Sequence, residues 1–380
     1  MTQPRRPATR ADFEIAVICA LPTEADAVDA LFDYHWDHDG PPYDKARGDP
    51  NAYSTGAIGR HNVVLAHMPG MGKASATAVA AGCHASFPNI KLALVVGVCG
   101  VVPFRPGSSE TTETVLGDVI VSEGVVQYDL GRRLPEKFVV KDTLQDALGR
   151  PNTEIRTLLA KLRTLRSRKA LQAKMAGYMV VLRGESELAA VYPGAAQDRL
   201  FEAMYRHVSD GMSCEECARD GKLVPRVRLQ QGDAQPAVHF GLIASGDTVM
   251  KSGEDRDAIA QQAGVIGFEM EGAGVWDIFP CVVIKGACDY ADSHKTKVWQ
   301  RYAAATAAAC MKAFLGHWVP SQASQTGEPP RTSPLPAEGE RGAASSQPLG
   351  SSTQNINNIT TGSGHANIAQ NQTNYQTFGK

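Results

Sequence analysis

Carboxylates stand at the ends of two predicted strands, where such groups can act as acids or bases or bind hydroxyl groups. Glu24 comes just after the apolar run 13–20, and Asp289 follows the run 281–285. Considered singly, Glu24 could stabilise the N-terminus of the helix that it opens, and Asp289 could cap its strand. Ligands of open α/β sheets, however, bind outside the carboxyl ends of the strands. The two acids are therefore candidates for one site.

Further acids and glycines repeat this pattern. Glu269 and Glu271 flank Met270 and point to opposite sides if the chain is extended, so only one of the two carboxylates need face a pocket. Glycine motifs, which let backbone N–H groups face a ligand, are Pro69-Gly70-Met71-Gly72-Lys73, Gly97-Val98-Cys99-Gly100 and Ser245-Gly246-Asp247. The first is not a phosphate-binding P-loop, because its spacing differs and no Ser or Thr follows its lysine. Repetition at several strand ends predicts a ligand site along one edge of a sheet.

The elements that must position these residues alternate along the chain. Near-continuous apolar runs predict strands covered on both faces. The strongest runs are 13–20, 62–67, 91–96 and 281–285, and weaker ones are 118–122 and 239–244. Alanine-rich segments predict helices at 24–32, 73–86, 272–278 and 298–315. This alternation predicts an α/β fold with helices on both faces of the sheet.

The predicted α/β domain occupies residues 13–318 and carries an insertion at about 142–235, which is polar and helical in character. Between Arg156 and Lys174 the insertion has seven cations and no acid. Such a run predicts either a solvated helix face or a surface that binds an anion.

The chain outside this domain is predicted to lack a packed core. Residues 1–12 are polar and are expected to be disordered. The stretch 319–350 is rich in proline, which predicts an extended linker. The segment 351–380 is rich in Asn and Gln and forms a separate module.

Composition bounds the class of protein. Of 380 residues, 43% are hydrophobic, and 38 Lys and Arg nearly balance 40 Asp and Glu. This balance argues against a protein that coats nucleic acid or an acidic membrane. No stretch reaches the roughly 18–20 apolar residues that span a bilayer, and the N-terminus lacks the apolar region of a secretory signal. Several of the eight cysteines lie in apolar runs, where reduced thiols pack as small hydrophobes. We expect a cytoplasmic protein.

Taken together, the motifs resemble the purine nucleoside phosphorylase and nucleosidase superfamily, and most closely the methylthioadenosine/S-adenosylhomocysteine nucleosidase-like domains of fungal immune-receptor proteins. The matching pieces are ALPTE (20–24), PGMGK (69–73), VVGVCG (95–100), GDVIVSEGVVQYD (117–129), HFGLIASGD (239–247), GFEMEGAGVW (267–276) and CDYADSHK (288–295). The order and spacing of FEMEG and CDYAD are the most specific features. The resemblance implies a three-layer sandwich with a mixed, mostly parallel, twisted central sheet, a homo-oligomer, and no cofactor or metal.

By this resemblance, the acids would break an N-glycosidic bond. Asp289 would be the general acid at the purine N7, and Glu24 would hold the attacking water. Glu271 would bind the ribose 2′ and 3′ hydroxyls, with Met270 packed on the sugar. The reaction passes through an oxocarbenium-like sugar, so Asp289 must stay protonated at neutral pH, which burial behind the base would favour. The other substrate-binding candidates are Glu269, Phe268, Ser245, Gly246, Asp247, Val249, Gly97, Cys99 and Gly100.

Two departures from the family pattern bear on the reaction. The positions of the Arg and Ser that bind phosphate in phosphorylases resemble Val95 and Val98 here, which cannot bind an anion. Hydrolysis is therefore favoured, with a phosphate-dependent phosphorylase or an inactive nucleoside-sensing scaffold as the alternatives. Val249 stands where nucleosidases often carry an aromatic residue that stacks on the base, although Asp289 still favours a purine.

The substrate group at the 5′ position is a separate question. Some immune-effector relatives cleave adenine from ATP, and such an enzyme needs cations near the 5′ carbon. Candidates are Lys73, Arg105, Arg132, Arg133 and the basic segment 156–174. Adenine nucleosides or nucleotides, including ATP, are the favoured substrates.

Two features of the insertion and its surroundings leave alternatives open. Cys214 and Cys217 form a C-x2-C pair that could bind a metal, act in redox chemistry or belong to a structural loop. Zinc needs four ligands, and His207 is the only nearby addition, so no metal is assigned. His294 could be an ordinary loop histidine or could gate the substrate.

The C-terminal segment 351–380 resembles a second kind of sequence, unrelated to the enzyme domain. Low charge, many Asn and Gln residues and scattered isoleucines are tolerated by cross-β stacking. Residues 353–374 resemble the amyloid signalling motifs that fungal nucleotide-binding receptors share with their effectors. A matching receptor segment would then template stacking of 351–380 and cluster the enzyme domains. The alternative is an inert disordered tail.

Overall fold

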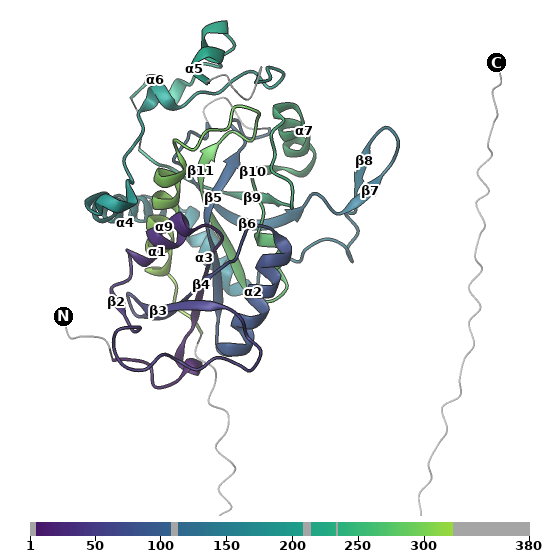
Figure 1. Cartoon of the computed structure of the whole chain (residues 1–380). Coiled ribbons are helices and arrows are strands. Elements are labelled where there is room, and N and C mark those ends of the chain that lie inside the picture. The colour runs from purple at the N-terminus through teal and green to yellow at the C-terminus, as the bar shows by residue number, and fades with distance from the viewer. Residues whose placement is uncertain (1–4, 108–112, 208–213, 233–234, 322–380) are drawn as a thin grey trace, which may run out of the picture. The chain divides into compact units, whose positions relative to one another are not determined.

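The computed structural model describes residues 5–107, 113–207, 214–232 and 235–321 (Figure 1). The chain divides into two compact units, Met1–Gln322 and Ala323–Lys380, and every described residue belongs to the first. The predicted amyloid motif at 351–380 and all but the start of the linker 319–350 lie outside the described residues.

One large mixed sheet organises the first unit. Its strands are β1 (Ile15–Cys19), β2 (Tyr34–His35), β3 (Ala52–Ile58), β4 (His61–His67), β5 (Leu92–Val101), β6 (Val119–Gln127), β9 (Val238–Ser245), β10 (Val265–Glu269) and β11 (Cys281–Asp289). Their order is β10-β9-β6-β11-β5-β1-β4-β3-β2. β1 pairs in parallel with β4 and β5, and β11 pairs in parallel with β5 but antiparallel with β6. The predicted strands all exist, and β2, β3 and β10 are additions.

The sheet also closes on itself at one end. β10 pairs in parallel with β9 and antiparallel with the end of β5, where Gly267 lies opposite Val101 and Phe268 opposite Gly100. The strands β5, β11, β6, β9 and β10 therefore form a ring. This closure, which the sequence did not predict, brings the end of β10 beside the ends of β5 and β11.

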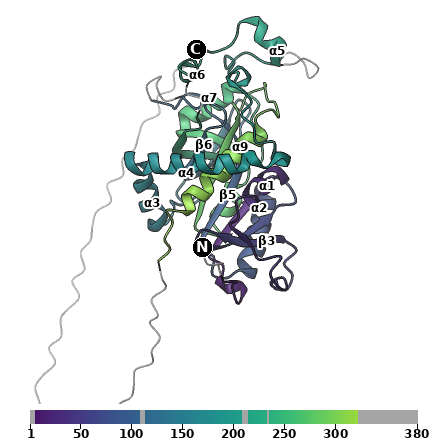
Figure 2. The same cartoon turned by 90° about the vertical axis from the view of Figure 1, so that its left-hand side faces the viewer.

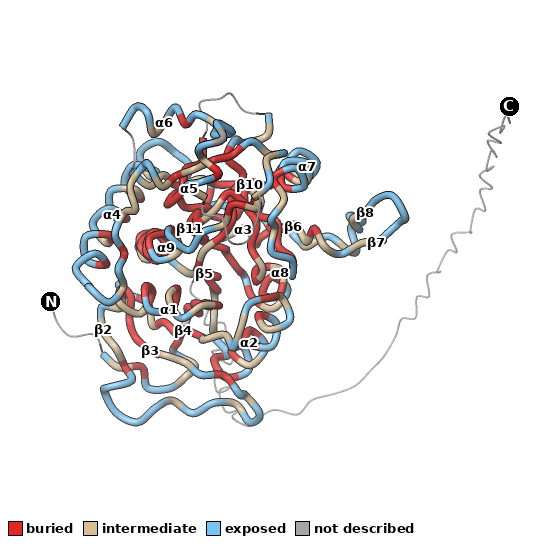
Figure 3. Tube along the Cα trace, turned by 45° about the horizontal axis from the view of Figure 1, so that its top comes forward, coloured by how far each residue is buried: buried red, intermediate tan, exposed pale blue. Residues whose placement is uncertain are grey.

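Helices cover both faces of the sheet, as predicted for a three-layer sandwich (Figures 1 and 3). The helices are α1 (Pro22–Asp29), α2 (Lys73–Ser86), α7 (Gly253–Ala263), α8 (Gly272–Trp276) and α9 (Gln300–Leu315). α1 and α9 pack together on one face, and α2 and α8 pack together on the other. In Figure 3 the buried residues concentrate in the strands and in α9.

The helix α9 is buried on all sides. It approaches β11 so closely that a Cβ on Gly286 would lie 2.0 Å from the carbonyl oxygen of Ala303. Its outer side is covered by α4 (Leu165–Gly184), which crosses it in Figure 2. Leu171 and Met175 are among the buried residues of α4. The first part of the insertion therefore completes the hydrophobic core.

The cations of the insertion point to solvent. α3 (Thr153–Arg163) and α4 separate at Thr164, and the residues Arg156, Lys161, Arg163, Arg166, Arg168, Lys169 and Lys174 are all exposed. These cations form the solvated face that was one of the two predictions for this segment.

The rest of the insertion is built of short turns. It contains η2 (Ser186–Leu188), η3 (Ala195–Gln197), α5 (Cys214–Cys217), η4 (Ala218–Asp220) and α6 (Val227–Gln230). Before the insertion, a hairpin of β7 (Gly131–Arg133) and β8 (Phe138–Val140) projects from the sheet in Figures 1 and 3.

The N-terminal segment 1–12, expected to be disordered, is ordered over its described part. Thr9 caps η1 (Arg10–Asp12), and the Tyr43 hydroxyl donates to the Pro7 carbonyl at 2.9 Å. These contacts attach the segment to the domain.

All eight cysteines are free thiols, and all but Cys214 are buried. Burial raises the pKa of Cys83 to about 12, which keeps that thiol neutral. Within the described ranges, no helix combines the length and apolarity needed to cross a membrane.

Candidate active site

A cavity of about 300 Å³ opens at the joined ends of β1, β5, β10 and β11. Its walls come from several parts of the chain that are far apart in sequence. The lining residues are Ala20, Leu21, Glu24, Met71, Val98, Cys99, Gly100, Thr248, Val249, Met250, Phe268, Glu269, Met270, Glu271, Cys288, Asp289, Lys295, Thr296, Lys297 and Gln300. The volume suits a ligand of small-molecule size.

A buried lysine anchors the acids beneath this cavity. Lys285, in the interior of β11, is 1% exposed, and its Nζ lies 2.8 Å from Glu271 Oε2 and 3.7 Å from Glu269 Oε2. Burial by itself would lower the pKa of Lys285, but Glu271, Glu24 and Glu269 outweigh it and raise that pKa. Lys285 is therefore charged, pairs with Glu271 and Glu269, and compensates the nearby charge of Glu24.

Glu269 and Glu271 have different environments. Burial raises the pKa of Glu269, whose oxygens accept hydrogen bonds from the N–H groups of Glu271 and Gly272. Burial also opposes ionisation of Glu271, but the contact with Lys285 lowers its pKa below the usual value. Glu271 is therefore the anionic partner that faces the cavity, ready to accept hydrogen bonds from hydroxyl groups.

Both of these acids line the cavity, although in an extended chain only one of them would need to face it. β10 ends at Glu269, and Glu271 has helical backbone angles as the N-cap residue of α8. The chain turns between them, so the two carboxylates converge on Lys285.

Glu24 is held by backbone groups from two strand ends. Its Oε2 accepts hydrogen bonds from the N–H groups of Ala20 at 3.0 Å and Leu21 at 2.9 Å, and its Oε1 accepts one from Val98 at 2.8 Å. Burial raises the pKa of Glu24, with the attraction of Lys285 working in the opposite direction. A fixed carboxylate with a raised pKa suits a general base that activates water near neutral pH.

Glu24 has room because Gly97 has no side chain. A Cβ on Gly97 would lie 2.2 Å from Glu24 Oε1. We therefore expect Gly97→Ala to displace the carboxylate and to lower turnover about 100-fold, since small misplacements of catalytic groups have effects of that size. Steady-state kinetics on the substrate identified below measures this effect.

Gly70→Ala is the matched control, because a Cβ at Gly70 meets nothing within 4 Å. Both variants should unfold cooperatively. Full activity in Gly97→Ala would show that the position of Glu24 does not matter for turnover.

Asp289 ends β11 on the opposite wall from Glu24. Its Oδ1 accepts hydrogen bonds from the Lys295 ammonium at 2.7 Å and from the Ala291 N–H at 2.9 Å. Ala291 has a positive φ of 52°, which non-glycine residues rarely adopt and which is retained where the surroundings enforce it. The turn after β11 therefore aims Asp289 into the cavity.

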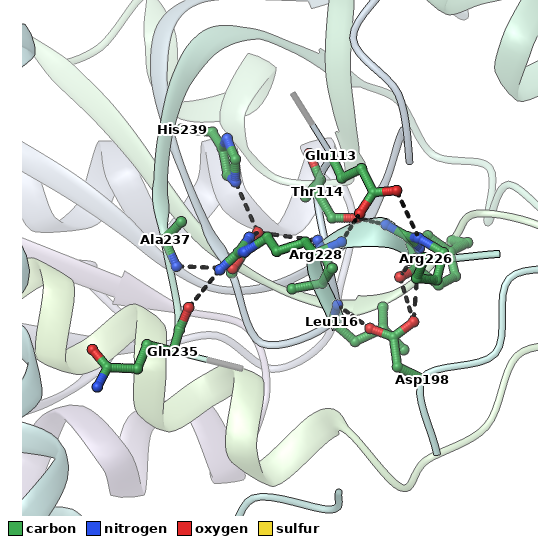
Figure 4. Close-up of polar contacts among 12 residues, drawn as sticks. Glu113, Thr114, Leu116, Asp198, Arg226, Arg228, Gln235, Ala237 and His239 are labelled. Atoms are coloured by element: carbon green, nitrogen blue, oxygen red, sulfur yellow. Dashed lines mark hydrogen bonds and ion pairs between the residues drawn. The ribbon is translucent and has the colours of Figure 1, made fainter. Parts of the chain in front are cut away.

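The insertion enforces this turn through Tyr290, the residue after Asp289. The Tyr290 hydroxyl donates to Asp198 Oδ1 at 2.5 Å and accepts a hydrogen bond from Arg226. Arg226 also donates to the Thr114 carbonyl at 2.5 Å (Figure 4). All of these groups are buried, so the network is a fixed support for the turn.

A second buried network lies next to the first (Figure 4). Asp118 accepts from Arg228 at 2.5 Å and pairs with His239 Nε2 at 2.8 Å. Burial would raise the pKa of Asp118, but the bonds with His239 and Arg228 lower it. This network joins the insertion to β6 and β9.

Most of the predicted binding residues line the cavity. They are Asp289, Glu24, Glu271, Met270, Glu269, Phe268, Val249, Cys99 and Gly100. Others support the walls: Gly97 makes room for Glu24, Ser245 accepts from the Ala273 N–H, and the Gly246 N–H donates to the Glu269 carbonyl. Asp247 binds Lys73, with the Lys73 N–H donating to Asp247 Oδ1 at 2.7 Å.

The four cations proposed for a 5′ phosphate do not line the cavity. Lys73 pairs with Asp129 at 2.5 Å and with Asp247. Arg105 donates to the Phe240 carbonyl. Arg132 and Arg133 are exposed on the β7–β8 hairpin.

Three lysines of the site were missed as functional residues. The position of Lys285 could have been recognised from the sequence, because a lysine inside the apolar run of β11 needs buried partners of opposite charge. Lys295 and Lys297 follow β11 in a loop, and only the tertiary structure shows that they line the cavity.

The other open questions concern the loop behind Asp289. His294 is buried and stacks on Phe201 with ring centroids 3.8 Å apart, and burial lowers its pKa to about 4. This packing fits the ordinary loop histidine.

Cys214 and Cys217 lie in α5, and among the described residues no group of three or more candidate ligands could hold a metal ion.

The fold and the site together define an α/β protein with buried carboxylates around a cavity at the strand ends of a mixed sheet. Residues 14–315 match the family described as the phosphorylase superfamily, and the chain belongs to it.

The chain is also similar to individual proteins and solved structures. A nucleotide-binding leucine-rich repeat (NLR)-like protein of Hyaloscypha variabilis is 35% identical over 319 residues, which are 82% of this chain and 30% of the relative. This chain thus spans less than a third of that relative's length. A solved structure of 5′-methylthioadenosine/S-adenosylhomocysteine nucleosidase from Helicobacter pylori has a TM-score of 0.50 at 16% identity, covering 81% of this chain and 100% of that one. Futalosine hydrolase of the same organism has a TM-score of 0.47 at 16% identity, covering 81% and 99%. At this identity the first structure supports the fold.

Proposed function

We propose that this chain is an N-ribosyl hydrolase that releases the base from purine nucleosides or nucleotides, with adenine compounds, ATP among them, as the favoured substrates. The observation that carries the proposal is that Glu24, Glu271 and Asp289 line one cavity. The solved nucleosidases named above share the fold, which supports the same class of reaction.

In the proposed reaction, a water oxygen bonds to C1′ as the bond from C1′ to N9 breaks. Asp289 gives a proton to N7 of the leaving base, and Glu24 accepts a proton from the attacking water. Glu271 accepts hydrogen bonds from the ribose hydroxyls and is held for this by Lys285 at 2.8 Å. The products are the free base and the sugar, which carries the water oxygen at C1′ and keeps whatever 5′ group the substrate had.

Hydrolysis is favoured over phosphorolysis by the wall beside Glu24. Val98 lines the cavity there, and Val95 is buried in β5. Neither side chain can bind an anion. Glu24 occupies the adjacent space as a buried carboxylate, which would repel phosphate.

The deciding experiment incubates the purified chain with adenosine, methylthioadenosine, AMP and ATP, with and without phosphate, and separates the products by chromatography. Free base released without phosphate would establish the hydrolase. Release only with phosphate would make the chain a phosphorylase. An absence of base release from every substrate would favour the inactive scaffold.

The proposed biological role is that of an immune effector whose enzyme domains cluster through residues 351–380. The relative named NLR-like supports a link to a nucleotide-binding receptor. A receptor segment of matching sequence would template cross-β stacking of the tail.

Deleting residues 351–380 is therefore expected to abolish assembly and to leave the unfolding transition of the enzyme domain unchanged. Thioflavin fluorescence and sedimentation measure assembly, and circular dichroism measures unfolding. Assembly that survives the deletion would contradict the role of the tail.

A further inference from the structure

The ion pair at Asp289 conflicts with the acid role that the reaction requires. Lys295 Nζ lies 2.7 Å from Asp289 Oδ1, and the two side chains are 22% and 13% exposed. The ammonium of Lys295 occupies a position on the Asp289 carboxylate from which that carboxylate must reach N7 of the base. In the free enzyme Lys295 therefore competes with the base for Asp289.

Lys295 is able to leave this position. It belongs to the loop between β11 and α9, and its flexible side chain lines the open cavity. Lys297 lines the same cavity and is exposed, and its side chain makes no ion pair or hydrogen bond with any residue that the structure describes. The wall beside Asp289 thus presents two ammonium groups, one of them without a counter-charge in the described chain.

The other titratable groups near Asp289 do not provide a second switch. Burial raises the pKa of the Cys99 thiol in β5 and of the Cys288 thiol in β11, so both stay neutral. Burial also raises the pKa of Asp292, which accepts the His294 N–H. Among these groups only Lys295 places a positive charge on the Asp289 carboxylate.

We propose that Lys295 is a specificity-determining residue, because a substrate with a negative charge on its 5′ side draws the ammonium away from Asp289 and frees Asp289 to contact N7 of the base. This inference rests on the proposed hydrolase function. In the anti form of a purine nucleoside, the edge that carries N7 and C8 faces the 5′ carbon, so a lysine beside the acid can reach a 5′ phosphate. The proton that passes from Asp289 to N7 is replaced from water after each turnover.

The first test compares Lys295→Gln with Lys297→Gln on ATP and on adenosine. For Lys295→Gln we expect the ratio of kcat/KM for ATP to that for adenosine to fall about tenfold or more, because a charge-assisted contact is lost with ATP only. Turnover of adenosine should rise, since no ammonium competes with the base for Asp289. Lys297→Gln should raise KM for ATP without increasing adenosine turnover.

The division of the effect between kcat and KM separates this role from a structural one. With adenosine, Lys295→Gln should raise kcat and leave KM unchanged, because the neutral 5′ hydroxyl makes no ion pair with the ammonium. With ATP, the same variant should raise KM, because the ion pair with the 5′ phosphates is lost. An equal loss of activity on both substrates would overturn the proposal.

A measurement on the wild type needs no variant. Inorganic tripolyphosphate added with adenosine should occupy the position of the 5′ phosphates and raise adenosine turnover at neutral pH. Base release that does not respond to tripolyphosphate, together with an unchanged substrate ratio in Lys295→Gln, would contradict this inference alone. A wild type that releases no base from any substrate would contradict the proposed function as well.

Discussion

Replacing Lys285 with methionine is expected to destabilise the fold by about 3–5 kcal/mol, because removing one partner of a buried ion pair leaves the other charge without compensation. Lys285 is 1% exposed, and Glu271 lies 2.8 Å away. Urea unfolding followed by circular dichroism measures the change. The matched control is Lys91→Met, since the Lys91–Glu14 pair is one-third exposed and such pairs contribute about 0–1 kcal/mol.

The pH dependence of this variant follows from the carboxylates left behind. In the wild type the pKa of Glu271 is lowered, so its stabilising effect is present at neutral pH and is lost as pH falls through the folded value. Without Lys285, burial raises the pKa of Glu271 and Glu269, and the folded state binds more protons than the unfolded state. The deficit relative to the wild type should therefore be smaller at pH 5 than at pH 8. A difference in the free energy of unfolding between wild type and variant that grows as the pH falls would show that Lys285 does not compensate Glu271 and Glu269.

Asp289→Asn is expected to lower base release by about 10²–10⁴, the usual contribution of a general acid. Asparagine keeps the shape of the side chain but cannot give a proton to the leaving base. Chromatography of the released base measures the effect, and thermal unfolding checks that the fold is retained.

Asp277→Asn is the control for this experiment, because Asp277 is exposed after α8 and does not line the cavity. Its activity should match the wild type. Unreduced release in Asp289→Asn would assign the acid role to another group.

Helices and strands were predicted correctly where the local pattern of apolar residues is strong. The apolar runs of β1, β4, β5 and β11 and the alanine-rich helices α2 and α9 appear within a few residues of their predicted bounds. These strands are apolar along their whole length because both of their faces are buried, and such a run can be recognised in a single sequence. The strand β3 (Ala52–Ile58), whose residues at one end are partly exposed, was missed because its pattern is weaker.

The sequence by itself also determined the chemical character of the site. Glu24 and Asp289 were selected as acids that follow apolar runs and Glu271 as part of the motif around Met270, and the structure places all three on one cavity. Positions just after parallel strands meet at one edge, so this grouping follows from local order along the chain.

Only the tertiary structure decided how these acids are charged and held. Lys285 compensates Glu271 and Glu269 because β11 runs beside β5 within the closed ring of strands. Lys295 reaches Asp289 because a left-handed residue, Ala291, turns the chain after β11. Arg226 and Asp198 support that turn from an insertion far away in sequence. Such contacts depend on pairings between distant segments, whereas the choice of residue types at strand ends is local.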